Sequence, residues 1–334
     1  MKKQIREALS RRSFFTRGSV LLGGAVAGGA GLAGCRKPDV TQGRVFDNKP
    51  GPGMDYDPSM VKWRRGDSVD ITMDGAKNLR ILPSGGVVVI GADGFEAVDL
   101  PEYGGLAKVP AVTEPRYDLI EWPDGGFFTA NRQDIYFHEN ADDKEGTIRL
   151  SLGGNAFITN LETDGEFIYV ADMGNRLFWK VSPTGRMIGN WGKKDPALNQ
   201  PGLVVPSPYL ELTLDPQGQL WGVNPGRHTV DLYNEDFSVE RSWGFASART
   251  AGFCGCCNPT HLVALADGTF LTCEKGLPRV KLYSEKGELI GLVVPPDDFE
   301  PGNESIVIAA RDADEVLVLN PTGQKIWRYL RNAT

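Results

Sequence analysis

One sequence pattern repeats six times between residue 78 and the end of the sequence. It consists of an apolar run, a tight turn, a second apolar run rich in Val, Ile, Phe and Tyr, a loop, and a third run. The first turns of the six units are Ser84-Gly85, Asp124-Gly125, Asp164-Gly165, Gln217-Gly218, Asp267-Gly268 and Ala313-Asp314. Successive turns lie 40, 40, 53, 50 and 46 residues apart. Six units of short strands at such a period are typical of a β-propeller. The sequence therefore predicts an all-β, six-bladed β-propeller.

The sixth unit has one apolar run too few for a four-stranded blade. Its runs are SIVIAA, EVLVLN and KIWRYLR. The upstream segment 61–71 (VKWRRGDSVDI) contains Val61, Trp63, Val69 and Ile71, whose apolar side chains a linker would not need. We predict that this segment pairs with KIWRYLR and closes the ring, so that no sheet edge stays open. The alternative is that it continues the linker that precedes it.

Two units carry a recognisable motif. The third, DGEFIYVADMGNRLFWKVSPTGRMIGNWG, resembles an NHL repeat, in which an Asp- or Asn-bearing loop is followed by Arg and a hydrophobic strand. The fifth, DGTFLTCEKGLPRVKLYSEKGELIGLV, is similar and has Glu274 where the usual Asp stands. The resemblance extends over most of residues 70 to 330 and implies an NHL-type propeller fold more firmly than a function. Asp172 with Arg176, and Glu274 with Arg279, are interpreted as ion pairs that stabilise blades.

The first 34 residues have the layout of a signal peptide, with a basic start followed by an uncharged Gly/Ala/Leu/Val stretch. The stretch containing Arg11 and Arg12 (SRRSFF) resembles the twin-arginine (Tat) export motif. Leu-Ala-Gly-Cys at residues 32–35 resembles a lipobox, so Cys35 is the predicted lipidation site. A membrane-spanning anchor is the alternative, but the apolar stretch is short for a bilayer, which needs about 20 residues.

These boundaries define three parts: a signal peptide at 1–34, a lipid-anchored flexible tether at 35–60 and the propeller at 61–334. The tether is predicted from its Pro, Gly and Asp content. Without residues 1–34 the chain has 30 Lys and Arg against 42 Asp and Glu, a net charge of −12. Nucleic acid is therefore excluded as a partner. We expect a periplasmic or cell-surface lipoprotein, held at the membrane by the lipid on Cys35.

Two long connections, 192–208 and 245–259, fall on the same face of the predicted propeller. Because long loops on a rigid scaffold usually carry binding sites, we predict the functional site and a protein partner on this face, around the channel mouth. Aligning the innermost strands by their distance from the first turn brings several residues to the level of His261. The polar members are Asn78, Asp118, Glu211 and His261, and the level is completed by Ile158 and Val307.

Four cysteines remain in the predicted propeller: Cys254, Cys256 and Cys257 in FCGCCNP, and Cys273 in TFLTCEK. Pairing about the Asp267-Gly268 turn sets Leu262 opposite Cys273 and His261 opposite Glu274, so all four thiols are expected to converge beside His261. Three hypotheses stay open. The thiols form two structural disulfides, or they bind a metal ion or iron–sulfur cluster together with His261, or they form a reactive dithiol activated by Lys275 and His261.

No GxSxG or Walker sequence is present. The favoured function is therefore non-catalytic: an exported propeller that binds a partner protein or small ligand on its long-loop face, for example as an accessory of a membrane redox complex. The alternative is a redox or metal-binding protein built on the cysteines. The cofactor of that alternative is not identified by the sequence.

Overall fold

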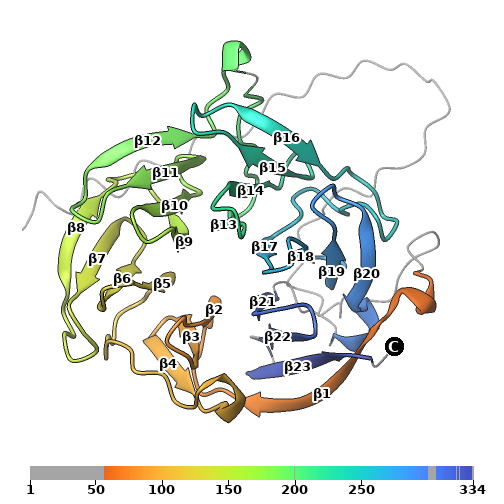
Figure 1. The fold of residues 1–334 in the computed structure, drawn as a ribbon, viewed down its shortest axis with the longest axis horizontal. Coiled ribbons are helices and arrows are strands. Elements are labelled where there is room, and N and C mark those ends of the chain that lie inside the picture. Colours follow the sequence, from red (N-terminus) through yellow and green to blue (C-terminus); the bar gives the residue numbers. More distant parts are fainter. Residues whose placement is uncertain (1–55, 199, 300–305, 321, 323, 333–334) are drawn as a thin grey trace, which may run out of the picture. The chain divides into compact units, whose positions relative to one another are not determined.

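The computed structural model describes residues 56–198, 200–299, 306–320, 322 and 324–332. In this part of the chain the repeats form six antiparallel sheets around a central axis (Figure 1). The predicted six-bladed, all-β propeller is thus confirmed. The signal motif at Arg11 and Arg12, the lipidation site Cys35 and most of the predicted tether lie outside the described residues. Among the residues described, no helix has the length and apolar character needed to span a bilayer.

The blades follow one another in chain order. Blade one contains β2 (Asn78–Ile81), β3 (Val87–Gly91) and β4 (Gly94–Val98); blade two contains β5 (Asp118–Glu121), β6 (Phe127–Ala130), β7 (Asp134–His138) and β8 (Thr147–Ser151); blade three contains β9 (Ile158–Thr163), β10 (Ile168–Asp172), β11 (Leu177–Val181) and β12 (Met187–Trp191). Blade four contains β13 (Leu212–Leu214), β14 (Leu220–Asn224), β15 (Thr229–Tyr233) and β16 (Val239–Trp243); blade five contains β17 (His261–Ala264), β18 (Phe270–Glu274), β19 (Arg279–Tyr283) and β20 (Leu289–Val294). Blade six contains β21 (Val307–Ala310), β22 (Glu315–Asn320), β23 (Lys325–Arg331) and β1 (Trp63–Asp70).

Blade six is closed by the N-terminal strand, as predicted. Strand β1 pairs with β23 in antiparallel register from Trp63 opposite Arg331 to Asp70 opposite Lys325. The Trp63 side chain is buried, and its Nε1 donates to the Ala313 carbonyl at 2.7 Å. Figure 1 shows β1 beside β23 although the two strands lie at opposite ends of the described chain. The first and the last strand of the described chain thus belong to the same sheet, which closes the ring.

The segment before β1 contacts blade five. The 3-10 helix η1 (Pro58–Met60) is followed by a parallel bridge between Val61 and Leu292 of β20, and the Tyr56 hydroxyl donates to Asp297 at 3.1 Å. The described end of the predicted tether thus lies along the outer strand of blade five.

Aromatic side chains pack the blades against one another. The second strand is buried along its whole length in blades one to five, as in the VVVIG run of β3 and the LWGVN run of β14, because neighbouring blades cover both of its faces. Trp221 and Phe270, from blades four and five, lie 4.8 Å apart between ring centroids. Gly222 is needed at the interface between blades four and three, since a Cβ there would lie 2.4 Å from the Phe178 ring of blade three. Trp221, Trp191 and Trp243 all belong to this core, as expected for inter-blade packing.

Two local expectations are corrected. In blade five, His261 stands opposite Cys273 and Leu262 opposite Thr272, one residue away from the predicted register. The turn contains three residues between the paired Leu265 and Thr269, with Gly268 at a φ of 80° that closes it. In blade three, Asp172 accepts hydrogen bonds from Asn175 and Trp179 side chains instead of forming the expected ion pair with Arg176.

Candidate functional site

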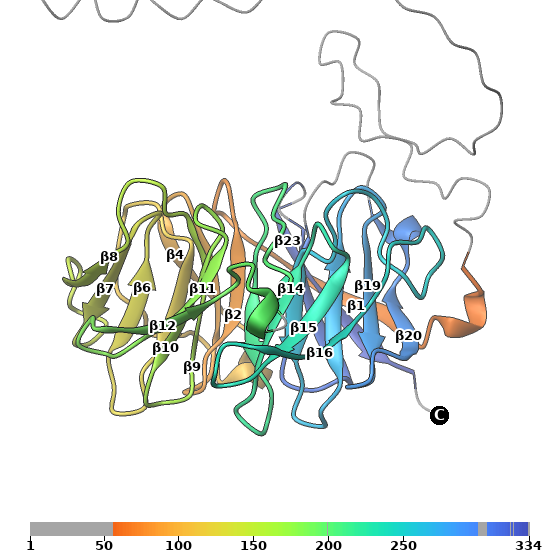
Figure 2. The ribbon, with the colours of Figure 1, turned by 90° about the horizontal axis from the view of Figure 1, so that it is seen from above.

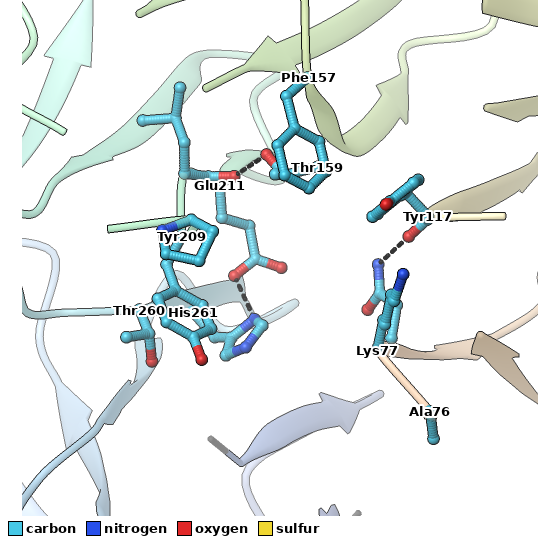
Figure 3. Close-up of a pocket in the computed structure, with 12 residues that line it drawn as sticks. Ala76, Lys77, Tyr117, Phe157, Thr159, Tyr209, Glu211, Thr260 and His261 are labelled. Atoms are coloured by element: carbon cyan, nitrogen blue, oxygen red, sulfur yellow. Dashed lines mark hydrogen bonds and ion pairs between the residues drawn. The ribbon is translucent and has the colours of Figure 1, made fainter. Parts of the chain in front are cut away.

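A cavity of about 290 Å³ lies at the channel mouth on the face that carries the long loops (Figure 3). Its walls come from the residues that directly precede the innermost strands, among them Lys77, Tyr117, Phe157 and Tyr209. Figure 2 shows that the strands run between two faces of the propeller, so the segments entering the innermost strands gather on one face. We call this cavity, with Lys77, Tyr117, Phe157, Tyr209 and His261, the mouth site.

Aromatic rings form the rim of the mouth site. Tyr117 and Phe157 meet edge to face, with centroids 4.8 Å apart. Each rim ring carries a cation on its face: Lys77 over Tyr117 at 4.1 Å, Arg132 over Phe157 at 5.3 Å, and Lys275 over Tyr209 at 5.0 Å. Such contacts hold both partners in place. The rim is therefore apolar and locally positive in a chain whose net charge is negative.

The predicted polar level around the channel is present. Asn78, Asp118 and His261 are the first residues of their innermost strands, and Glu211 directly precedes β13. Asn160 is a fifth polar member of this level, and counting residues from the first turn did not identify it. A register shift in β9 places Asn160 opposite Ala171, while Ile158 stands opposite Asp172. The sequence sign that could have revealed it is that Asn160 is a polar residue within a predicted innermost strand.

Three of these side chains connect each blade to the next. The Leu161 backbone N–H donates to Asp118 Oδ2 at 2.6 Å. The Leu212 N–H donates to Asn160 Oδ1 at 3.1 Å, and the Leu262 N–H donates to Glu211 Oε2 at 2.8 Å. Buried backbone donors need such partners. Asp118, Asn160 and Glu211 are thus primarily inter-blade links.

Arg80 lines the channel beside this level. Its guanidinium donates to Asp118 Oδ1 at 2.9 Å and to Glu162 Oε1 at 2.6 Å, so it joins blades one, two and three. Burial raises the pKa of Glu162 even though Arg80 opposes the shift. Sequence reasoning missed both residues, although Arg80 and Glu162 lie two positions after Asn78 and Asn160 and hence on the same strand face.

His261 differs from the other members of the level. Its Nδ1 lies 2.8 Å from Glu211 Oε2, and within the described part of the chain neither ring nitrogen has a well-aligned hydrogen bond. The residue is only 9% exposed, and Figure 3 shows its imidazole beside Glu211 and Tyr209 at the cavity. The Tyr209 and His261 rings are 6.3 Å apart, nearly perpendicular. Nε2 thus has no partner among the described residues. A buried nitrogen without a partner is unusual and marks a place where a ligand group would be stabilised.

The cysteines do not form the expected cluster. Within the described residues none of the four forms a disulfide, and Cys256 is exposed whereas the other three are buried. The Cys256 and Cys257 sulfur atoms lie 3.3 Å apart, a contact between separate thiols. Cys273 packs in the apolar core shared with blade six, where burial raises its pKa well above the usual value. The expected convergence of all four thiols is therefore corrected.

The reason for this separation is strand alternation. Cys273 shares with Leu271 the face of β18 that packs on blade six, whereas Glu274 points to the opposite face, where the loop from blade four arrives. Burial, reinforced by Glu274, raises the pKa of Cys254 to about 12. Across the described residues, no group of three or more His, Cys, Asp or Glu side chains is arranged to hold a metal ion. The geometry does not favour the metal or iron–sulfur hypothesis.

A buried ion network fixes the cysteine-bearing loop to blade five. Arg279 Nε and Lys281 Nζ each lie 2.7 Å from Glu274 Oε1, and the Cys254 N–H donates to Oε2 at 2.7 Å. Both cations also donate to the Gly252 carbonyl, at 3.3 and 2.7 Å. Burial alone would raise the pKa of Glu274, but Lys281 and Arg279 outweigh it and hold that pKa below its usual value. The Glu274–Arg279 pair is confirmed, and Lys281 is an addition that the sequence did not reveal.

Comparisons with known proteins agree on the fold. No protein-family model matches the chain, and no curated protein matches it. Among solved structures, the chain is similar to a catalytically inactive virginiamycin B lyase from Staphylococcus aureus with quinupristin (TM-score 0.53, 12% identity, covering 80% of this chain and 99% of that one). It is also similar to regucalcin, a calcium-binding protein from Agrobacterium tumefaciens (0.53, 12%, 78% and 92%), and to YCF48 bound to D1 peptide (0.51, 10%, 83% and 98%). Identities this low establish the six-bladed propeller type and nothing further.

Proposed function

We propose that this chain is an exported, lipid-anchored β-propeller that serves as a binding platform, with the mouth site as the place where a small ligand or an exposed group of a partner protein binds. His261 carries the proposal. Its Nδ1 contacts Glu211, but its buried Nε2 has no hydrogen-bond partner among the described residues. Leaving a buried polar atom unpaired costs about 1–3 kcal/mol, and a ligand atom at the mouth site would remove that cost. The other polar members of the level already have partners in neighbouring blades.

The residues that line the mouth site indicate the chemical class of its ligand. Tyr117, Phe157 and Tyr209 offer ring surface for a planar or apolar moiety. Lys77 at the rim favours a negative charge, and His261 at the floor favours a hydrogen-bonding group. At about 290 Å³ the cavity is at the small end of ligand sites. A small aromatic carboxylate, or one aromatic or acidic side chain of a protein partner, fits these features.

The location in the cell rests on the N-terminal sequence. A Tat-like motif at Arg11 and Arg12 followed by the lipobox-like Cys35 supports export and attachment to the outer side of a membrane. Because an anchored propeller would lie beside other membrane proteins, we also propose a protein partner at that membrane, for example a redox complex to which the propeller is accessory. YCF48, a protein of similar fold, has been seen with a bound peptide, which supports the platform as a type of function.

Binding is tested at the mouth site itself. A photo-cross-linking residue replaces Tyr209 in cells, and the matched control replaces Phe245, which is 54% exposed and belongs to a long loop but does not line the cavity. In parallel, the purified chain is titrated with a panel of small aromatic carboxylic acids. We expect a specific adduct at position 209 and saturable binding that His261→Gln removes. Equal labelling at both positions together with no binding in the panel would contradict the proposal.

Export and anchoring are tested separately. Replacing Arg11 and Arg12 together by Lys should leave the chain in the cytoplasm, because the twin-arginine pair is the recognition element. Cys35→Ala should allow export and yield a form that lacks incorporated fatty acid. Cell fractionation and labelling with palmitate measure both. Export that is unaffected by the paired Lys substitution would rule out the Tat assignment.

A further inference from the structure

The loop that carries Cys256 and Cys257 is held by hydrogen bonds from two blades. The Cys254 N–H is bound by Glu274 at 2.7 Å. The Gly255 carbonyl lies 2.7 Å from Nε2 of His228, which comes from the turn between β14 and β15 in blade four. The Asn258 side chain donates to the Cys254 carbonyl at 2.6 Å. Anchors from two blades thus fix the backbone on both sides of the adjacent cysteines.

Asn258 also fixes the position of Lys275. Its amide donates to the Lys275 carbonyl at 3.0 Å and accepts from the Lys275 N–H at 2.9 Å. The Lys275 ammonium lies 5.0 Å from the Tyr209 ring centroid and interacts with the Cys257 thiol. A lysine held in this way keeps a positive charge next to one of the two sulfurs.

The two thiols are in different environments. Cys256 is exposed, whereas Cys257 is only 2% exposed, and their sulfurs lie 3.3 Å apart. Burial of Cys257 would raise its pKa, but hydrogen bonds from Lys275 and other neighbours outweigh this and lower the pKa below the usual value. An accessible sulfur beside a stabilised thiolate is the arrangement of a reactive thiol pair.

We propose that Cys256 and Cys257 form a thiol–disulfide exchange site, in which Cys256 meets the substrate and Cys257 resolves the mixed disulfide. The substrate class is a disulfide of a small molecule or an exposed disulfide of a protein. Cys254 and Cys273 take no part, because both are buried and their thiol pKa values are raised.

The reaction balances in two steps. The Cys256 sulfur attacks one sulfur of the substrate disulfide, so that a Cys256–substrate disulfide forms and one substrate thiolate leaves. Cys257 then attacks the Cys256 sulfur, forms a Cys256–Cys257 disulfide and releases the second substrate thiolate. The protons of the two cysteine thiols pass to the two released thiolates. Two electrons move from the protein to the substrate disulfide.

The oxidised pair should be easily reduced again. Adjacent Cα atoms are about 3.8 Å apart, less than the roughly 4.4–6.8 Å usual for disulfides, so a bond between neighbouring cysteines is strained. Strained disulfides are labile and react readily with thiols. The site therefore exchanges electrons in both directions and does not serve as a structural staple.

The test uses the purified full-length protein with oxidised glutathione as the substrate disulfide, followed by alkylation and intact mass measurement. In the wild type we expect loss of two thiols and two hydrogen atoms, reversed by reduced glutathione. Cys256→Ser should not react, and Cys257→Ser should stop at a stable adduct with one glutathione. Cys273→Ser is the matched control and should behave as the wild type does.

Lys275→Met provides a second readout. Because Lys275 is among the groups that lower the pKa of Cys257, we expect resolution of the mixed disulfide near neutral pH to slow and its pH profile to move upward. Thermal unfolding of each variant separates this effect from misfolding. The proposal is overturned if the wild type retains the thiols of both Cys256 and Cys257 in excess oxidised glutathione, or if Cys257→Ser loses two thiols as the wild type does. Neither result depends on ligand binding at the mouth site.

Discussion

The buried ion network of blade five gives the sharpest test of how the cysteine loop is held. Glu274→Gln removes the negative charge and keeps the size of the side chain. In the structure this carboxylate faces Arg279 and Lys281, whose side chains are 1% and 0% exposed. The variant would leave both cations buried beside a neutral amide.

The expected loss of stability follows from these contacts. Removing one partner of a buried ion pair costs about 3–5 kcal/mol. The lower end applies here for two reasons. Both cations keep hydrogen bonds to the Gly252 carbonyl, and burial has already lowered the pKa of Lys281 to about 8, so this residue can become neutral. A loss of about 3 kcal/mol corresponds to a fall in Tm of roughly 6–12 °C for a domain of this size.

Equilibrium unfolding in urea measures the change, and Glu285→Gln is the control. Glu285 pairs with Arg241 at 2.6 Å, but both side chains are well exposed, so its loss should cost less than about 1 kcal/mol. Trypsin provides a local readout, since Arg249 is exposed in the loop that the network holds. We expect faster cleavage after Arg249 in Glu274→Gln. If the two variants are equally stable and equally resistant, the network does not hold the loop.

Three further outcomes are expected from equilibrium unfolding. Trp63→Ala should lose about 3–5 kcal/mol, because Trp63 is a buried residue of the closing strand; an unchanged midpoint would show that ring closure contributes little. Asp118→Asn should lose about 3 kcal/mol, since its fully buried carboxylate is one of the two that neutralise Arg80; an unchanged midpoint would show that this ion pair contributes little. His261→Phe should change stability little, because Glu211 keeps the Leu262 N–H when its contact with Nδ1 is lost, and the unpaired Nε2 is no longer buried, while binding at the mouth site is lost; a large destabilisation would make His261 structural.

The fold could be predicted because its signals are local and repeated. Six turn-flanked apolar runs define the blades, and the apolar faces of Trp63 and Val69 identify the closing strand. The register of β17 and β18 was missed by one residue. It depends on whether the turn at Gly268 has two or three residues, which is decided by the backbone conformation of that glycine and not by its identity.

The site was predicted in part for the same reason. Equal distance from the turn is enough to bring Glu211 and His261 to one level. The register shift in β9 that brings Asn160 to the same level does not change the spacing of the turns, so the sequence gives no sign of it. The arrangement of the cysteines depended on which face of β18 receives the loop. Glu274 on one face and Cys273 on the other settle this, and alternation along β18 becomes informative only once the path of the loop is known.

Blade five departs from the repeated pattern in ways that cost stability. At the channel level, Asp118, Asn160 and Glu211 each bind a backbone N–H of the following blade, whereas His261 forms no such bond within the described residues. The same blade buries the charges around Glu274. All blades of a propeller pack in the same way. A departure in one blade that costs stability is therefore better explained by function than by folding. Both exceptions border Lys275, which lies on the Tyr209 ring of the mouth site and beside Cys257. A ligand in the mouth site would therefore lie next to the exchange site, and the two proposed activities would act on one bound molecule.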